Sequence, residues 1–263
     1  MGKTVIIASG KGGTGKTTTT ANLGAALAMS GHLTVVVDMD MGLRNLDVAL
    51  GLESNIVYDI SDVIEGSCTV DEVLIKHTDY ENLYFIPAPQ TKDTSDLKEE
   101  DIKSVWECLA ERFEYCLIDA PAGLDGGFLY ASMCADSAVI VTTPELTALR
   151  DADRAVSVLE DEGITDIKVV INRIRADYID KGIMMNMDDC VDMIGVPVLG
   201  IVPEDEELII SALKGKIAVS NENSKAGRAF LNIASRMCGK EVPIMDFDEK
   251  EGFFERVKKL FKK

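Results

Sequence analysis

A glycine-rich segment joins a buried-strand pattern to a helical pattern near the start of the chain. The run 4–8, TVIIA, is short, apolar and β-branched, as expected of a strand covered on both faces of a sheet. The segment 10–17, GKGGTGKT, follows it, and the pattern from residue 17 to Gly31 is helical. A strand, a tight glycine turn and a helix in this order indicate a layered α/β structure.

The same alternation continues through most of the chain. Further strands are expected at 34–38, 83–87, 115–120, 137–143, 167–172 and 196–203, with helical patterns at 97–112, 147–162, 205–213 and 224–238. Right-handed crossovers then give a doubly wound, mostly parallel sheet flanked by helices, which we expect to form one domain over residues 1–238. The chain has 263 residues, enough for one large core, and no internal repeat that would indicate a duplicated two-site ATPase.

The glycine-rich segment matches the phosphate-binding pattern G-x-x-x-x-G-K-[ST]. Its glycines allow backbone N–H groups to turn around phosphate oxygens, and the following helix adds its partial positive charge. We therefore predict binding of ATP and Mg²⁺, with Lys16 on the β- and γ-phosphates and Thr17 on the metal. The predicted nucleotide-binding residues of the loop are Gly10, Lys11, Gly12, Gly13, Thr14, Gly15, Lys16, Thr17 and Thr18.

Three aspartates at strand ends are candidates for the same site. Asp119 ends the run YCLID, where a carboxylate would hold a Mg²⁺-bound water. Asp38 and Asp40 end the run TVVVDMD, with Asp38 a candidate metal ligand and Asp40 the better candidate to orient the attacking water. The alternative is a helix cap or a solvated strand end, since acidic residues are common there.

Several segments carry a family resemblance. KGGTGKTTTTANLGAALA resembles the deviant Walker A motif, K-G-G-x-G-K-[ST], of the ParA/MinD ATPases. DMDMGLRNLDVALG, LIDAPAGLD and TPELTALRDADRAVSVLE are similar to the corresponding segments of its cell-division members, so the resemblance covers essentially the whole chain. It implies a P-loop fold and a slow ATPase, stimulated by partner and membrane, that positions the division site by recruiting a division inhibitor.

The resemblance also implies roles for individual residues. Lys11, the extra lysine of the loop, would reach the partner's phosphates across an ATP-sandwiched homodimer, in the manner of an arginine finger. Asn172 would hydrogen-bond the adenine base, and the stretch Pro203 to Asp205 would close the base pocket. The division inhibitor MinC and, where present, the activator MinE would bind a surface that includes Arg44, Asn45, Glu145, Asp151 and Asp153.

The end of the chain differs in composition from the rest. Residues 239–252 read as an acidic linker, and 253–263, FFERVKKLFKK, fit an amphipathic helix. At about 100° per residue its apolar residues fall within an arc of about 120°, and these are Phe253, Phe254, Val257, Leu260 and Phe261. Cations around an aromatic face predict a helix that lies in an anionic membrane surface. A helix docked on the domain, or a protein-binding helix, is the alternative.

Charge and cysteine content separate the competing functions. The chain carries −18, and the final segment, with five cations and one glutamate, carries +4, so the rest carries −22. That charge argues against a ParA-type partition ATPase with a DNA-binding surface, and no specific nucleic acid is expected. The six cysteines are scattered without a C-x-x-C pair and none follows Asp119 in APAGLDGGF, which argues against an iron–sulfur relative.

Localisation follows from the same features. Reduced thiols and the lack of an apolar run of about 18–20 residues indicate a cytoplasmic protein, reversibly bound at the inner face of the cell membrane. A flagellar-number regulator of the FlhG type shares the ATPase and the lipid tail and is the nearest alternative. Such regulators usually carry a helical N-terminal extension, whereas the first strand here is expected at Thr4.

Overall fold

The structure, a computed structural model, describes residues 1–263 except 42, 91–97, 125 and 245–263. Its described part forms an eight-stranded sheet in the order β3-β4-β2-β5-β1-β6-β7-β8, in which β3 alone runs antiparallel to its neighbour. The predicted doubly wound, mostly parallel sheet is confirmed. The strands are β1 (Lys3–Ala8), β2 (Thr34–Asp38), β3 (Ile75–Lys76), β4 (Leu83–Ile86), β5 (Tyr115–Asp119), β6 (Ser137–Thr142), β7 (Ile167–Ile174) and β8 (Val198–Pro203).

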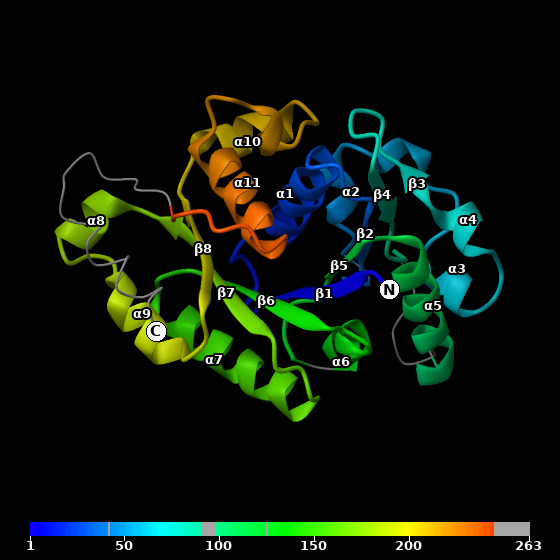
Figure 1. The fold of residues 1–263 in the computed structure, drawn as a ribbon, viewed down its shortest axis with the longest axis horizontal. Coiled ribbons are helices and arrows are strands. Elements are labelled where there is room, and N and C mark those ends of the chain that lie inside the picture. Colours follow the sequence, from blue (N-terminus) through cyan, green and yellow to red (C-terminus); the bar gives the residue numbers. More distant parts are fainter. Residues whose placement is uncertain (42, 91–97, 125, 245–263) are drawn as a thin grey trace.

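Helices cover both faces of this sheet (Figure 1). Helices α1, α2, α10 and α11 lie on one face, and α5, α6, α7 and α9 lie on the other. The α-helices are α1 (Lys16–Met29), α2 (Leu46–Leu50), α3 (Ile60–Ile64), α4 (Val70–Val73), α5 (Glu99–Arg112), α6 (Gly126–Ser132), α7 (Leu146–Asp161), α8 (Ala176–Asp180), α9 (Met187–Ile194), α10 (Glu206–Leu213) and α11 (Lys225–Met237). Short 3-10 helices are η1 (Glu53–Asn55) and η3 (Ala218–Ser220).

The central strand β1 shows why the strands read as continuous apolar runs. Val5 and Ile7 pack into the core beneath α1 and α11, while Ile6 and Ala8 pack into the core beneath α5 and α7. All four side chains are buried, because alternate residues of a strand face opposite sides and both sides are covered here.

Strand register brings the carboxyl ends of three strands together. Ile7 of β1 pairs with Asp119 of β5, and Asp38 of β2 pairs with the same Asp119. Loops and helix starts that follow these strands therefore meet at one edge of the sheet, which is where open α/β sheets bind ligands.

The predicted elements differ from the structure mainly in extent. Helix α1 ends at Met29, before the left-handed Gly31, and β7 continues to Ile174. The helices of eight residues or fewer other than α10 were not predicted, because one or two turns carry too few residues to show a clear period. In α3 a capping box supplies the missing signal: the Asp59 side chain accepts the Ser61 amide proton, and the Asp59 amide donates to Asp62.

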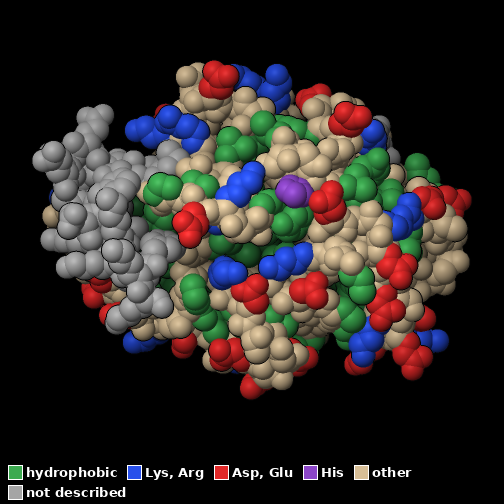
Figure 2. Space-filling view, viewed as in Figure 1, with side chains coloured by type: hydrophobic (Ala, Val, Ile, Leu, Met, Phe, Trp, Pro, Cys, Tyr) green, Lys and Arg blue, Asp and Glu red, His purple; other side chains and the backbone are tan. Residues whose placement is uncertain are grey.

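Surface properties of the described ranges bear on the membrane and nucleic-acid predictions. Lysine and arginine side chains on the face shown in Figure 2 are interspersed with aspartate and glutamate, without a continuous basic surface among the described residues there. Within those residues, none of the helices has the length and apolar character of a bilayer-crossing segment. The predicted amphipathic helix 253–263 lies outside the described residues, as does most of the linker, so the division into domain, linker and tail stays a prediction.

Candidate nucleotide-binding site

Two glycines of the loop between β1 and α1, Gly10 and Gly15, could not be replaced by another residue without a clash. Gly15 is the N-cap of α1 with φ 92°, and a Cβ there would lie 2.2 Å from Nδ2 of Asn172. A Cβ on Gly10 would lie 1.9 Å from the backbone oxygen of Asp151 in α7. At Gly13, by contrast, a Cβ would meet no atom within 4 Å, so the loop is open on that side.

Asp119 gathers three donors from the first turns of α1. Lys16 Nζ lies 2.9 Å from its Oδ1, and Thr20 Oγ1 donates to the same oxygen over 2.8 Å. Thr17 Oγ1 donates to Oδ2 over 2.7 Å. The structure thus brings the predicted lysine, hydroxyl and carboxylate together. Thr20 was not among the predicted residues, although its spacing of three from Thr17 places both on one helix face.

Asp38 is bound by the loop that follows it. Its two carboxylate oxygens accept the backbone N–H groups of Asp40, over 2.9 Å, and Leu46, over 3.1 Å. Burial, and then repulsion from Asp119, raise the pKa of Asp38 to about 7, against the opposing effect of the two amides. Asp38 therefore holds the backbone of Asp40 and of Leu46 at the end of β2, and its role as a metal ligand stays a prediction.

The loop held by Asp38 contains two predicted partner-binding residues. The Asp40 carbonyl accepts the Arg44 amide proton over 3.2 Å. Arg44, at φ 30°, donates from Nε to the buried Asp47 carboxylate over 2.8 Å. Asn45 is exposed at the N-cap of α2. The side chain of Arg44 is therefore fixed by its own chain, while Asn45 faces solvent.

Lys11 lies at the mouth of the loop and faces the start of α7. Its Nζ is 3.5 Å from Thr147 Oγ1 and 4.0 Å from Glu145 Oε2, and both lysine and glutamate are exposed. Asp151 packs against Gly10 through its backbone, and Asp153 is exposed on the same helix. Glu145 and Asp151, two of the predicted partner residues, thus adjoin the nucleotide loop. The action of Lys11 on a second copy stays a prediction.

Asn172 ties β7 to the phosphate loop. Its Nδ2 donates to the Thr14 carbonyl over 2.8 Å, and its Oδ1 accepts the Arg173 amide proton over 2.9 Å. Arg173 has φ 57°, an uncommon conformation for a residue with a side chain. The structure shows a positioning contact that the sequence did not indicate, and the adenine contact stays a prediction.

The predicted base-pocket stretch ends β8 and begins α10. Pro203 is the last residue of β8, and Asp205 is the N-cap of α10, accepting the Glu207 amide proton over 3.0 Å. The other Asp205 oxygen accepts hydrogen bonds from the Ser224 hydroxyl, over 2.8 Å, and from the Ala226 amide, over 2.9 Å. Burial opposes ionisation, yet these hydrogen bonds hold the pKa of Asp205 below its usual range. The side chain of Asp205 joins α10 to α11, so any contact with a base would come from its backbone.

The residues present fit a magnesium nucleotide. The Thr14 hydroxyl is buried and has no hydrogen-bond partner, the loop is open at Gly13, and Thr17 and Asp119 offer oxygen ligands side by side. Within the described ranges, no three His, Cys, Asp or Glu side chains converge as a metal site. A small set of protein oxygens suits Mg²⁺, which keeps several waters and takes phosphate oxygens as ligands.

Comparison with known proteins identifies the family. The CobQ/CobB/MinD/ParA nucleotide binding domain family matches residues 5–219. The chain belongs to this family. Within it, the septum site-determining protein MinD of Synechocystis sp. is 46% identical over 94% of this chain and 93% of its own.

Solved structures of MinD proteins share the fold of this family member. The Aquifex aeolicus protein in a MinC:MinD cell division complex has a TM-score of 0.88 at 37% identity, covering 94% of this chain and 100% of that one. The Pyrococcus horikoshii protein complexed with Mg-ADP has a TM-score of 0.81 at 31% identity, covering 90% and 96%. Membership of a nucleotide-binding ATPase family agrees with the donors gathered around the P-loop.

Proposed function

We propose that this protein is an ATP-dependent membrane switch that takes part in placing the cell-division site. ATP binding joins two copies, the dimer presents two lipid-binding tails, and partner-stimulated hydrolysis separates the copies again. The observation that carries the proposal is a phosphate loop with a second lysine, Lys11, at its exposed mouth. Relatives named for septum-site determination, similar over nearly the whole chain, support it.

The chemistry is transfer of the γ-phosphoryl group to water. Lys16 and the loop N–H groups bind the phosphates, Thr17 and Asp119 hold the metal, and Asp40 orients the water. The water oxygen attacks the γ-phosphorus and the bond to the ADP oxygen breaks, which yields ADP and phosphate. Mg²⁺ supplies positive charge that offsets the charge of the phosphate oxygens.

Lys11 couples the nucleotide to dimer formation. In the single chain its ammonium faces Glu145 at 4.0 Å and Thr147 at 3.5 Å, both exposed. An exposed pair of this kind contributes at most about 1 kcal/mol, so the phosphates of a second copy compete for the lysine easily. Two facing triphosphates repel each other and need cations between them. The Lys11 of each copy supplies one cation to the phosphates bound by the other copy.

Two exposed segments carry apolar side chains that fit a protein partner. Leu43 and Val48, 69% and 52% exposed, flank the predicted partner residues Arg44 and Asn45 in sequence, and Leu146, 44% exposed, follows Glu145. Large apolar side chains exposed beside polar ones are typical of interaction surfaces. The division inhibitor MinC is the proposed partner, in keeping with the MinC:MinD complex of the Aquifex aeolicus relative. An activator such as MinE would use the same region.

The tail explains why membrane binding would depend on ATP. Five apolar side chains at about 1.5–3 kcal/mol each roughly offset the ordering of eleven residues at about 1–2 kcal/mol each. Anionic lipid adds about 1 kcal/mol per cation. One tail is therefore marginal, whereas two on a dimer gain about 10²–10⁴-fold through avidity.

Vesicle sedimentation tests the proposal. The full-length protein should pellet with anionic vesicles in ATP, and much less in ADP or with uncharged vesicles. Truncation after Gly252 should abolish pelleting without affecting ATP-driven dimerisation, measured by light scattering. Phe254→Glu should nearly match the truncation, because a carboxylate on the apolar face resists burial.

Phe254→Leu is the matched control, since it keeps an apolar side chain at the same position and should still pellet. If the truncated chain pellets like the full-length chain, the tail is not the anchor. If full-length protein pellets equally in ATP and ADP, the switch itself is wrong.

A further inference from the structure

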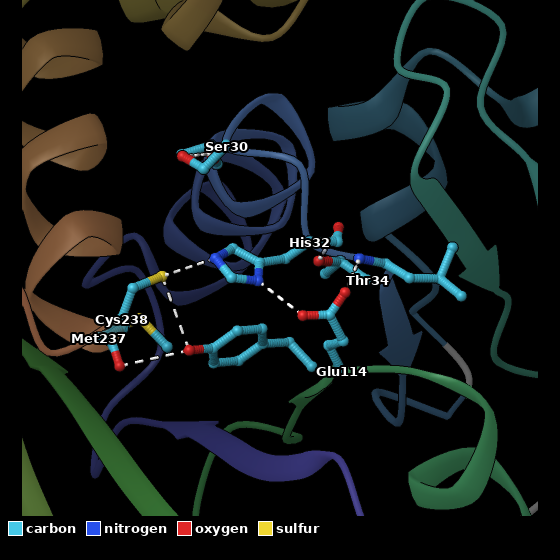
Figure 3. Close-up of polar contacts among 9 residues, drawn as sticks. Ser30, His32, Thr34, Glu114, Met237 and Cys238 are labelled. Carbon is cyan, nitrogen blue, oxygen red and sulfur yellow. Dashed lines mark hydrogen bonds and ion pairs between the residues drawn. The ribbon is translucent and has the colours of Figure 1, made fainter.

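Three side chains form a hydrogen-bonded series at the sheet edge opposite the nucleotide site (Figure 3). Cys238 Sγ lies 3.3 Å from His32 Nε2, and His32 Nδ1 lies 2.8 Å from Glu114 Oε2. Cys238 caps the end of α11, His32 lies between α1 and β2, and Glu114 lies between α5 and β5. Three segments distant in sequence thus bring a thiol, an imidazole and a carboxylate into line.

The hydrogen bonds assign a role to each group. A carboxylate only accepts hydrogen bonds, so His32 donates from Nδ1 to Glu114 and leaves Nε2 to accept the thiol proton. The hydrogen bond from His32, with that from the Leu33 amide, holds the pKa of Glu114 below its usual range, so the carboxylate stays charged. A nucleophile, a base and a group that orients the base is the arrangement that activates cysteine in enzymes.

Tyr115 provides a donor for the same sulfur. Its hydroxyl lies 3.6 Å from Cys238 Sγ and 3.4 Å from the Met237 carbonyl, and its ring meets the His32 ring edge-on at 5.3 Å. Burial, followed by the contact with Cys238, raises the pKa of Tyr115, so the phenol keeps its proton. An O–H directed at a thiolate stabilises its negative charge.

Four of the other five cysteines provide an internal comparison. All six are free, and Cys238 is partly exposed. Burial raises the pKa of Cys116 and of Cys190 to about 12. Burial and then nearby carboxylates also raise the pKa of Cys68 and of the exposed Cys134. His77, the second histidine of the chain, contacts the Leu50 carbonyl and the Asp79 amide rather than a thiol.

We propose that Cys238 is a reactive thiol that a small hydroperoxide oxidises to a sulfenic acid, with His32 as its base and Glu114 as a positioning residue. The thiol proton moves to Nε2, and the sulfur attacks one peroxide oxygen. As the O–O bond breaks, the second oxygen leaves and takes the proton from the imidazolium. The sulfur is oxidised, hydrogen peroxide is reduced to water, and His32 returns to its neutral form. This oxidation is independent of the function proposed for the nucleotide site.

Peroxide titration of the full-length protein tests the assignment. Hydrogen peroxide would be added in the presence of dimedone, which traps sulfenic acids, and each cysteine peptide would be quantified by mass spectrometry. Cys238 should react at least about tenfold faster than Cys134 at pH 7, although Cys134 is the more exposed. An equal or slower rate at Cys238 would overturn the proposal.

Two substitutions separate activation from mere exposure. His32→Gln keeps a polar group near the sulfur but cannot take the proton, and Glu114→Gln removes the charge that orients His32. Each should slow Cys238 about tenfold or more and leave Cys134 unchanged. An unchanged rate at Cys238 in His32→Gln contradicts the assignment. Labelling of the buried Cys116 would report that a variant has unfolded.

Discussion

Lys16 Nζ lies 2.9 Å from Asp119 Oδ1, and the two side chains are only 7% and 1% exposed. This ion pair joins the first residue of α1 to the last residue of β5. The two elements are far apart in sequence, but β5 lies beside β1 in the sheet, and β1 leads into α1. A buried pair is a weak source of stability, but removal of one partner leaves the other charge without compensation. The same two residues therefore contribute to folding and, in the proposed function, to binding of the nucleotide.

Lys16→Ala should abolish ATP binding, measured by calorimetry, because the phosphates lose their nearest cation. The free energy of unfolding at pH 7 should also fall by about 3 kcal/mol, because Asp119 stays buried beside Asp38. Adding Asp119→Asn should restore part of the stability but no ATP binding. ATP-dependent vesicle binding that survives in Lys16→Ala would show that the site is wrongly assigned.

Lys11→Ala should retain appreciable ATP binding and yet fail to dimerise, since Lys16 and the loop amides remain. Light scattering with and without ATP measures the difference. Glu145→Gln is the control: it removes the 4.0 Å ion pair within the chain, which is exposed and contributes little, so dimerisation should be nearly normal. A Lys11→Ala protein that dimerises with ATP means that this lysine acts only within its own chain.

Asn172→Ala should weaken binding of ATP by about tenfold, since Thr14 and the loop lose the support of β7. Inorganic tripolyphosphate, which has no base, separates the two possible causes. If Asn172 acts through the loop, affinity for tripolyphosphate falls as much as affinity for ATP. If only ATP binding weakens, the residue reads adenine, as the family resemblance implied.

Protonation of His77 should lower the stability of the fold in mild acid. Its Nε2 contacts the Leu50 carbonyl and its Nδ1 accepts the Asp79 amide proton, both over 3.0 Å, so the neutral ring is the one that fits. Burial lowers the pKa of His77 in the folded protein. Below about pH 6.5, the ordinary pKa of histidine, the unfolded chain therefore binds a proton at His77 more readily than the folded chain does. This contribution is fully present above that pH and declines as the pH falls towards the folded-state pKa.

Urea unfolding at pH 7.5 and 5.5 should therefore show a larger loss for the natural chain than for His77→Gln. The difference is at most about 1.4 kcal/mol per pH unit, the limit for one proton. Glutamine keeps a donor for the Leu50 carbonyl but does not titrate. Equal losses in the two proteins would assign the pH dependence to other groups.

The phosphate loop was predictable from sequence because glycine spacing and a following helix leave few alternatives. The sheet class was predictable for a similar reason: strands covered on both faces, such as β1, carry unbroken apolar runs. The contact of Asn172 with Thr14 was not, since it joins residues 158 apart and depends on strand order. The hydrogen bonds from the Asp40 and Leu46 amides to Asp38 were not predicted either. Short turns such as the one before α2 have no repeating pattern in the sequence that would indicate their backbone path.

Gly10 approaches the backbone of Asp151 so closely that no side-chain atom fits between the nucleotide loop and α7 at this point. A gap of even one methyl group would absorb a small movement of the loop, but no such gap exists here. Close-packed protein interiors transmit displacement instead of damping it. If the loop shifts on the proposed binding of phosphate, we therefore expect α7 to move with it, together with the residues predicted to contact a partner protein.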